Sequence, residues 1–190
     1  MRRPLFSVIV LSLIAAGCGG KSTPRGAGPG ASQPSSASTA GFETYTDAKY
    51  DFTIGYPKEW DKQEGAAGSA VAFLSPQESA SDDFRENVNV LVQMLPDKVT
   101  LDQYTKLSLD QAPKLITGFD LLDEGSTTLA GSPAHHVHYR GEQGAFRLEW
   151  KQVWTVQNGR AFVLTYTAER ERYGADLTIA GAMFATFRLP

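Results

Sequence analysis

The 190-residue chain lacks much of what several kinds of functional site require. Its single cysteine, Cys18, permits no internal disulfide and cannot by itself build a thiolate zinc site. It has no dense basic run and a formal net charge of −3, which argues against nucleic acid as a partner. No Gly-x-Ser-x-Gly elbow, phosphate-binding loop or dinucleotide fingerprint is present. We therefore predict no catalytic residue, no cofactor and no enzymatic activity.

The first 17 residues have the pattern of a secretory signal peptide. Met1-Arg2-Arg3 is a cationic head, residues 5–14 are apolar except for two serines, and Ala15-Ala16-Gly17 are small. The apolar stretch is shorter than the about 20 residues that a bilayer span needs, and no later segment approaches that length. We therefore expect residues 1–17 to be removed and the remainder to be exported.

The residues at this junction, Ile14-Ala15-Ala16-Gly17-Cys18, resemble the lipobox of bacterial lipoproteins, although Ala15 stands where that motif prefers leucine. The resemblance implies a lipid on the Cys18 sulfur, and a cysteine bearing several acyl chains such as palmitate binds a membrane stably. The alternative is an ordinary signal peptide that is cleaved near a cysteine. Gly19 in place of aspartate resembles the outer-membrane sorting pattern, so the expected location is extracytoplasmic, facing the periplasm where the cell has two membranes.

The segment that follows is predicted to be a disordered tether over residues 18–41. Between Gly19 and Gly41 only Lys21, Arg25 and Gln33 are not Gly, Pro, Ser, Ala or Thr. Such a composition has almost no apolar surface to offset the entropy of ordering the chain. The folded domain is therefore expected over residues 42–190, a length that needs no disulfide or metal for stability.

The folded region is predicted to be α+β, because its strands are grouped and its two helices are separate. Alternation and turn residues predict strands over 50–56, 69–74, 87–95, 119–129, 134–140, 146–156 and 161–167, with a loop over 75–86. Thr100 and Gln103 form a capping box for a helix that Pro113 should end or kink. Gly131-Ser132-Pro133 and Asn158-Gly159 mark turns, and residues 176–185 are expected to form the last helix.

The order of these motifs resembles that of PsbP-like domains. The resemblance is carried by residues 50–60, Asn87-Val88-Asn89-Val90, Leu101-Asp102-Gln103-Tyr104, residues 131–134 and 158–162, and Phe184-Ala185-Thr186-Phe187, and it spans residues 42–190. It implies a central antiparallel sheet flanked by helices in an α/β/α sandwich, the fold of PsbP, the bacterial lipoprotein DcrB and a nuclear Ran-binding protein. Because this superfamily has no common active site, the resemblance implies a fold and a binding or accessory role.

Three histidines are the candidate ligands for a metal. His136 and His138 should project from one face of a strand, where a carboxylate such as Glu149 could complete a zinc or copper site. The simpler interpretation is that they are strand histidines on a half-exposed face, and no metal site is expected. The acidic residues from Glu78 to Glu86 are interpreted as a solvated loop, and Trp60, Trp150 and Trp154 as core.

Two functional hypotheses follow for the domain, besides a third class, an enzyme without a recognisable motif, which no residue pattern favours. The first is a membrane-anchored, non-enzymatic accessory or protein-interaction module with an envelope protein as partner. The alternative is a carrier of a small molecule or metal ion in the cell envelope. A carrier should have a roomy apolar pocket with a few convergent polar groups, and an enzyme should have titratable groups with perturbed pKa values in a cleft. An interaction module should have neither, but should expose an apolar or aromatic patch.

Overall fold

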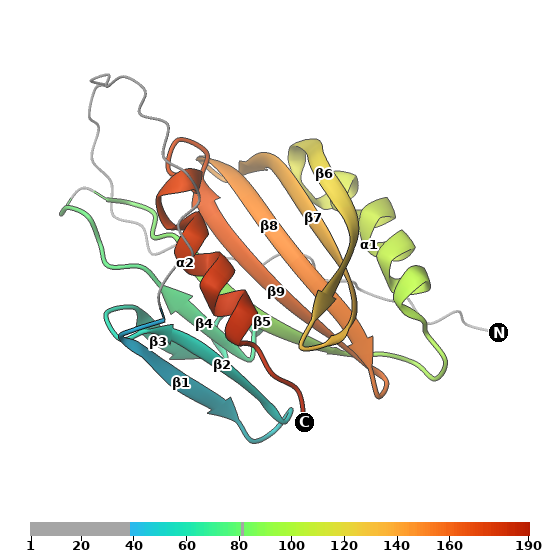
Figure 1. The fold of residues 1–190 in the computed structure, drawn as a ribbon. Coiled ribbons are helices and arrows are strands. Elements are labelled where there is room, and N and C mark those ends of the chain that lie inside the picture. The colour runs from blue at the N-terminus through green and yellow to red at the C-terminus, as the bar shows by residue number, and fades with distance from the viewer. Residues whose placement is uncertain (1–38, 81) are drawn as a thin grey trace.

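The computed structural model describes residues 39–80 and 82–190 (Figure 1). The predicted signal peptide, Cys18 and most of the predicted tether lie outside the described residues. The strands, in chain order, are β1 (Phe42–Asp47), β2 (Phe52–Pro57), β3 (Asp61–Glu64), β4 (Val71–Leu74), β5 (Asn87–Met94), β6 (Thr117–Leu129), β7 (Ser132–Gln143), β8 (Phe146–Gln157) and β9 (Arg160–Glu169). The helices are a short 3-10 turn at Ala66–Gly68, α1 (Leu101–Leu115) and α2 (Tyr173–Thr186).

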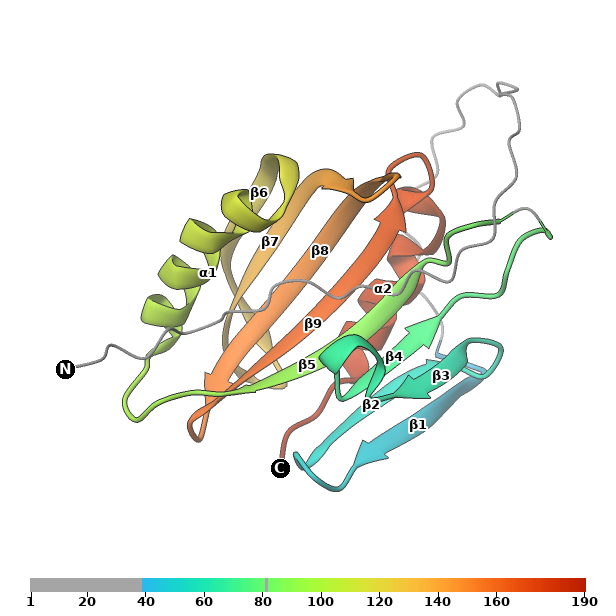
Figure 2. The ribbon, with the colours of Figure 1, turned by 180° about the vertical axis from the view of Figure 1, so that it is seen from behind.

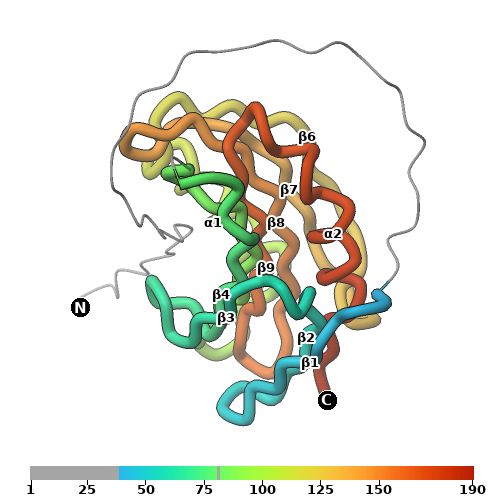
Figure 3. The backbone as a smooth tube through the Cα atoms, turned by 90° about the vertical axis from the view of Figure 1, so that its left-hand side faces the viewer, coloured from blue at the N-terminus to red at the C-terminus, as the bar shows by residue number. Residues whose placement is uncertain are grey.

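Seven of these strands form one antiparallel sheet in the order β3-β4-β5-β9-β8-β7-β6. The other two, β1 and β2, form a separate hairpin. Helix α2 lies across one face of the sheet, and α1 lies on the opposite face beside β6 and β7 (Figures 1 and 2). Figure 3 shows the two helices on either side of the strands. The predicted α+β fold, an antiparallel sheet between helices, is confirmed.

Each face of the sheet has its own apolar core. On the α2 face the β1–β2 hairpin, the sheet and α2 close on residues that include Phe52, Ile54, Phe73, Val88, Val90, Leu164, Tyr166 and Met183. On the α1 face the core includes Tyr104, Val137, Tyr139, Leu148, Trp150, Trp154 and Val163. Burial of each large side chain stabilises the fold by about 1.5–3 kcal/mol. The three tryptophans are buried, as predicted from the sequence.

Local structure at the start of α1 and at the β8–β9 turn agrees with the prediction. The Thr100 side chain accepts a hydrogen bond from the Gln103 backbone N–H, and the Gln103 side chain accepts one from the Thr100 N–H, which completes the capping box. Asn158 and Gly159 both have positive φ, 50° and 70°, as a tight hairpin between β8 and β9 requires. The capping box fixes the start of α1, and the turn joins the neighbouring strands β8 and β9.

Four details differ from the prediction. Strands β1 and β3 were not predicted, and β3 has no apolar alternation because its sequence, Asp-Lys-Gln-Glu, is exposed throughout. Pro113 does not end α1, which continues to Leu115, because a proline this close to the helix end removes a single hydrogen bond. The turn before β7 lies at Ala130-Gly131, where φ is 50° and 76°, so that Ser132 and Pro133 already belong to the strand.

The position of α2 leaves part of the sheet uncovered. Helix α2 packs against β2 and β9, near the middle of the molecule. Strands β8, β7 and β6 continue beyond it on the same face (Figure 1). Within residues 39–80 and 82–190, β6 pairs with no strand other than β7. A space therefore remains between α2 and the strands on this side of the sheet.

Candidate functional site

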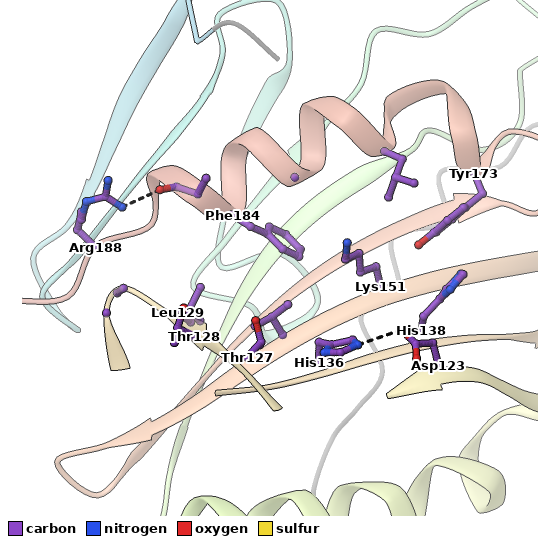
Figure 4. Close-up of a pocket in the computed structure, with 16 residues that line it drawn as sticks. Asp123, Thr127, Thr128, Leu129, His136, His138, Lys151, Tyr173, Phe184 and Arg188 are labelled. Atoms are coloured by element: carbon purple, nitrogen blue, oxygen red, sulfur yellow. Dashed lines mark hydrogen bonds and ion pairs between the residues drawn. The ribbon is translucent and has the colours of Figure 1, made fainter. Parts of the chain in front are cut away.

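An open cleft of about 990 Å³ lies between α2 and the uncovered part of the sheet (Figure 4). Its sheet side consists of residues from β6, the β6–β7 turn, β7 and β8, and its other side consists of residues from α2 and the chain just after it. This volume is at the upper end of the range that small-molecule sites occupy, about 300–1,000 Å³. The cleft is therefore a candidate ligand site.

The histidines predicted to share a face do so. His136 and His138 both line the cleft, since residues two apart on a strand project to the same side. His136 Nε2 lies 3.0 Å from Asp123 Oδ2 on β6, and His138 Nε2 lies 2.6 Å from Glu149 Oε1 on β8. The contact with His136 lowers the pKa of the Asp123 carboxyl. Each imidazole is thus held by its own carboxylate.

Two further contacts fix the orientation of these rings. The His138 ring stacks on Tyr173, the first residue of α2, with centroids 4.9 Å apart and an interplanar angle of 11°. The His136 ring lies over Gly125, where an added Cβ would approach His136 Cε1 to 3.1 Å. Gly125 therefore provides the space that lets His136 lie flat and reach Asp123.

A lysine stands beside these pairs without a partner of its own. Lys151 on β8 is directly opposite His138 in the β7–β8 register, and it is half-buried in the cleft. Its ammonium group has no hydrogen-bond or ion-pair partner within residues 39–80 and 82–190. Asp123 and Glu149, the carboxylates of this cluster, contact the histidines and not Lys151.

The same geometry bears on the metal hypothesis. His138 and Glu149 do come together, as predicted for a metal site, but His136 turns to a different carboxylate. No group of three or more His, Cys, Asp or Glu side chains is placed to hold a metal ion in the described part of the chain. The third histidine, His135, projects to the opposite face, where it lies against Trp154 and contacts Glu124.

The acidic loop before β5 contains one residue that sequence reasoning misplaced. Glu86, interpreted as solvated, is 3% exposed. Burial raises its pKa to about 7, and the carboxylates of Asp176, Asp82 and Glu169 act in the same direction. Glu86 is buried because it directly precedes β5, where the chain enters the sheet. Glu86 does not line the cleft.

A second feature lies at the free edge of the sheet. Large apolar side chains are exposed at Leu115, at the end of α1, and at Leu121 and Leu122 on β6, with exposures of 47%, 41% and 41%. Leu122 falls in an irregularity of the β6–β7 register and has no cross-strand partner there. Neither helix of the described chain is long and apolar enough to cross a membrane.

Comparison with known proteins decides the family. The family model described as PsbP matches residues 40–189. The chain belongs to the PsbP family. A search of curated proteins found no match.

Solved structures of other proteins share the fold at low sequence identity. The solution structure of cyanobacterial PsbP (CyanoP) from Synechocystis sp. PCC 6803 is 18% identical, with a TM-score of 0.60 over 88% of this chain and 100% of that one. LpqN, described as involved in cell envelope biogenesis of Mycobacterium tuberculosis, is 16% identical, with a TM-score of 0.57 over 78% and 92%. The Saccharomyces cerevisiae Ran-binding protein Mog1p is 9% identical, with a TM-score of 0.54 over 78% and 95%. At these identities the likeness shows the fold alone.

Proposed function

We propose that this PsbP-family protein is a non-enzymatic accessory module of the cell envelope, which binds another envelope protein and is held at the membrane by lipid on Cys18. The proposal has two parts, an anchor and a binding surface. The anchor is supported by the lipobox-like residues 14–18 and the signal-like segment before them. An envelope role is supported by the PsbP-like LpqN, whose description places it in envelope biogenesis.

The binding surface is supported chiefly by the contrast between the two edges of the sheet. The β3 edge has four residues, all polar or charged and exposed, which is how native sheets discourage pairing with other chains. The β6 edge has 13 residues, pairs with β7 alone among the described residues, and exposes Leu121 and Leu122. A long strand edge beside apolar side chains is suited to pairing with an extended segment of another protein.

The anchor is tested by fractionating cells that express the wild type or Cys18→Ala. We expect the wild type in the membrane fraction, labelled by a palmitate analogue, and the variant in the soluble fraction without label. Several acyl chains bind a membrane stably, and Cys18→Ala would carry none. Release of the variant from the membrane fraction should therefore be nearly complete. Tight membrane association of Cys18→Ala would contradict the anchor.

The binding surface is tested by comparing Leu122→Glu with Met94→Glu in native envelopes. Met94 is a matched control because it is also apolar and even more exposed, at 68%, but lies at the end of β5. A partner that docks on the β6 edge should co-purify with the wild type and with Met94→Glu and be lost from Leu122→Glu. Equal recovery of the partner protein with Leu122→Glu and with Met94→Glu would contradict an interface at the β6 edge.

A further inference from the structure

The cleft beside α2 has a polar end arranged around Lys151. Asp123, His138 and Lys151 lie opposite one another on β6, β7 and β8. His136 Nε2 lies 3.0 Å from Asp123 Oδ2, and His138 Nε2 lies 2.6 Å from Glu149 Oε1. The polar end is closed on the α2 side by Tyr173, which stacks on His138 (Figure 4).

The charged groups at this end are Lys151, Asp123 and Glu149, and both carboxylates contact a histidine and not Lys151. Asp123 is the one acidic residue among those that line the cleft, and it is already bound by His136. Lys151 has no hydrogen-bond or ion-pair partner in the part of the chain that the structure describes. Arg188, at the far end of the cleft, donates to the backbone carbonyls of Ala185 and Phe187 and has no carboxylate partner in that same part of the chain. A half-buried lysine whose ammonium group has no ion-pair partner in the described residues can pair with an anionic ligand.

The part of the cleft away from Lys151 combines apolar side chains with Thr127, Thr128 and Arg188. Leu129, Val153 and Phe184 are buried side chains that line it, and Leu177 on α2 adds a half-buried one. Helix α2 has glycine at position 181, where an added Cβ would meet no heavy atom within 4 Å. The small residue leaves the cleft open along the helix. The space can therefore hold a hydrocarbon group of substantial size next to the cationic end.

We propose that this cleft binds a small amphipathic anion, with its acidic head group at Lys151 and its apolar part against Leu129, Val153 and Phe184. The head group can be a carboxylate or a phosphate, since the lysine is a point charge that accepts either. The Tyr173 hydroxyl and the imidazole Nδ1 atoms of His136 and His138 make no hydrogen bond within the described residues. These groups are available to orient the head. Such binding is separate from the protein contact proposed at the β6 edge.

The same residues disfavour a metal cation in the cleft. The two carboxylates nearest to the histidines are engaged by imidazole nitrogens, and the Lys151 ammonium group stands next to them. A positive charge opposite His138 opposes the approach of a second cation. An anion, in contrast, would pair with Lys151 without displacing either histidine contact.

Calorimetric titration with short amphiphiles tests the proposal. The full-length chain carries Cys18→Ala so that it can be handled without detergent, and the probes are decanoate, decyl phosphate and uncharged decanamide below their aggregation limits. We compare this parent with Lys151→Met and Gly181→Leu. Lys106→Met is the matched control, because Lys106 is an exposed lysine on α1, on the other face of the sheet.

The parent should bind decanoate or decyl phosphate more tightly than decanamide. Lys151→Met should lower the affinity for the anionic probes by roughly 10- to 100-fold, since a hydrogen bond to a charged group is lost. The affinity for decanamide should not change. Gly181→Leu should weaken the binding of all three probes without lowering the melting temperature. Lys106→Met should bind the probes like the parent. The proposal would be overturned if the parent bound no probe, if it bound neither decanoate nor decyl phosphate more tightly than decanamide, or if the two lysine variants lost equal affinity.

Discussion

Replacing Glu86 by glutamine should remove most of the pH dependence of stability between pH 4.5 and 7. The Glu86 carboxyl is 3% exposed, and burial raises its pKa from the ordinary 4.5 to about 7. Nearby carboxylates of Asp176, Asp82 and Glu169 add repulsion to the charged form. The folded chain therefore keeps a proton on Glu86 at pH values where the unfolded chain has lost it.

The sign and size of the effect follow from this difference. Because the folded state binds more protons between pH 4.5 and 7, the free energy of unfolding must fall as the pH rises through this range. The raised pKa of Glu86 corresponds to a loss of up to about 3 kcal/mol at pH 8 relative to pH 4. The carboxyls of Glu169 and Asp176 also have raised pKa values, chiefly because of burial, and act in the same direction.

Urea unfolding at pH 5, 6, 7 and 8 measures this dependence. We expect the wild type to lose stability over this series and Glu86→Gln to lose much less, so that the variant is the more stable protein at pH 8. Glu59→Gln is the control, since Glu59 is exposed. If Glu86→Gln and Glu59→Gln had the same pH dependence as the wild type, the account of Glu86 would be refuted.

Three further substitutions test local structure by urea unfolding. Gly141→Ala should destabilise the fold by about 1–3 kcal/mol, because its Cβ would lie 2.4 Å from Ile116 Cγ2 and 2.9 Å from the Thr117 carbonyl oxygen; an unchanged midpoint would contradict this packing. Thr100→Ala should cost about 1 kcal/mol through loss of the α1 cap, with Thr100→Ser restoring it. Gly181→Ala should add up to about 1 kcal/mol, since the new methyl meets no atom within 4 Å; destabilisation would argue against an open position there.

Local patterns in the sequence predicted the elements whose side chains alternate or whose ends are capped. The capping box at Thr100 and the Asn158-Gly159 turn depend on neighbouring residues alone, and both are present. β3 was missed because a fully exposed strand has no apolar alternation. The burial of Glu86 was missed because its neighbours in sequence are polar, while the groups that raise its pKa come from α2 and the end of β9 as well as its own loop.

The sequence predicted only the part of the candidate site that lies on a single strand. Two histidines at alternate positions implied a common face, which the structure bears out. Their pairing with Asp123 on β6, the stacking of Tyr173 on His138, and the unpartnered Lys151 all depend on strand register and on where α2 crosses the sheet. Sequence spacing contains no information on that crossing, so the cleft could not be predicted.

The central claim is that this domain works by binding a partner at the β6 edge. Its most direct test is site-specific photo-crosslinking in native envelopes, with the crosslinking residue at position 122 on the β6 edge or, as a control, at position 62 on the β3 edge. We predict one discrete protein adduct from position 122, absent from position 62 and lost when Leu121→Glu is introduced into the same chain. Adducts of equal yield from both edges, or none from position 122, would contradict the claim.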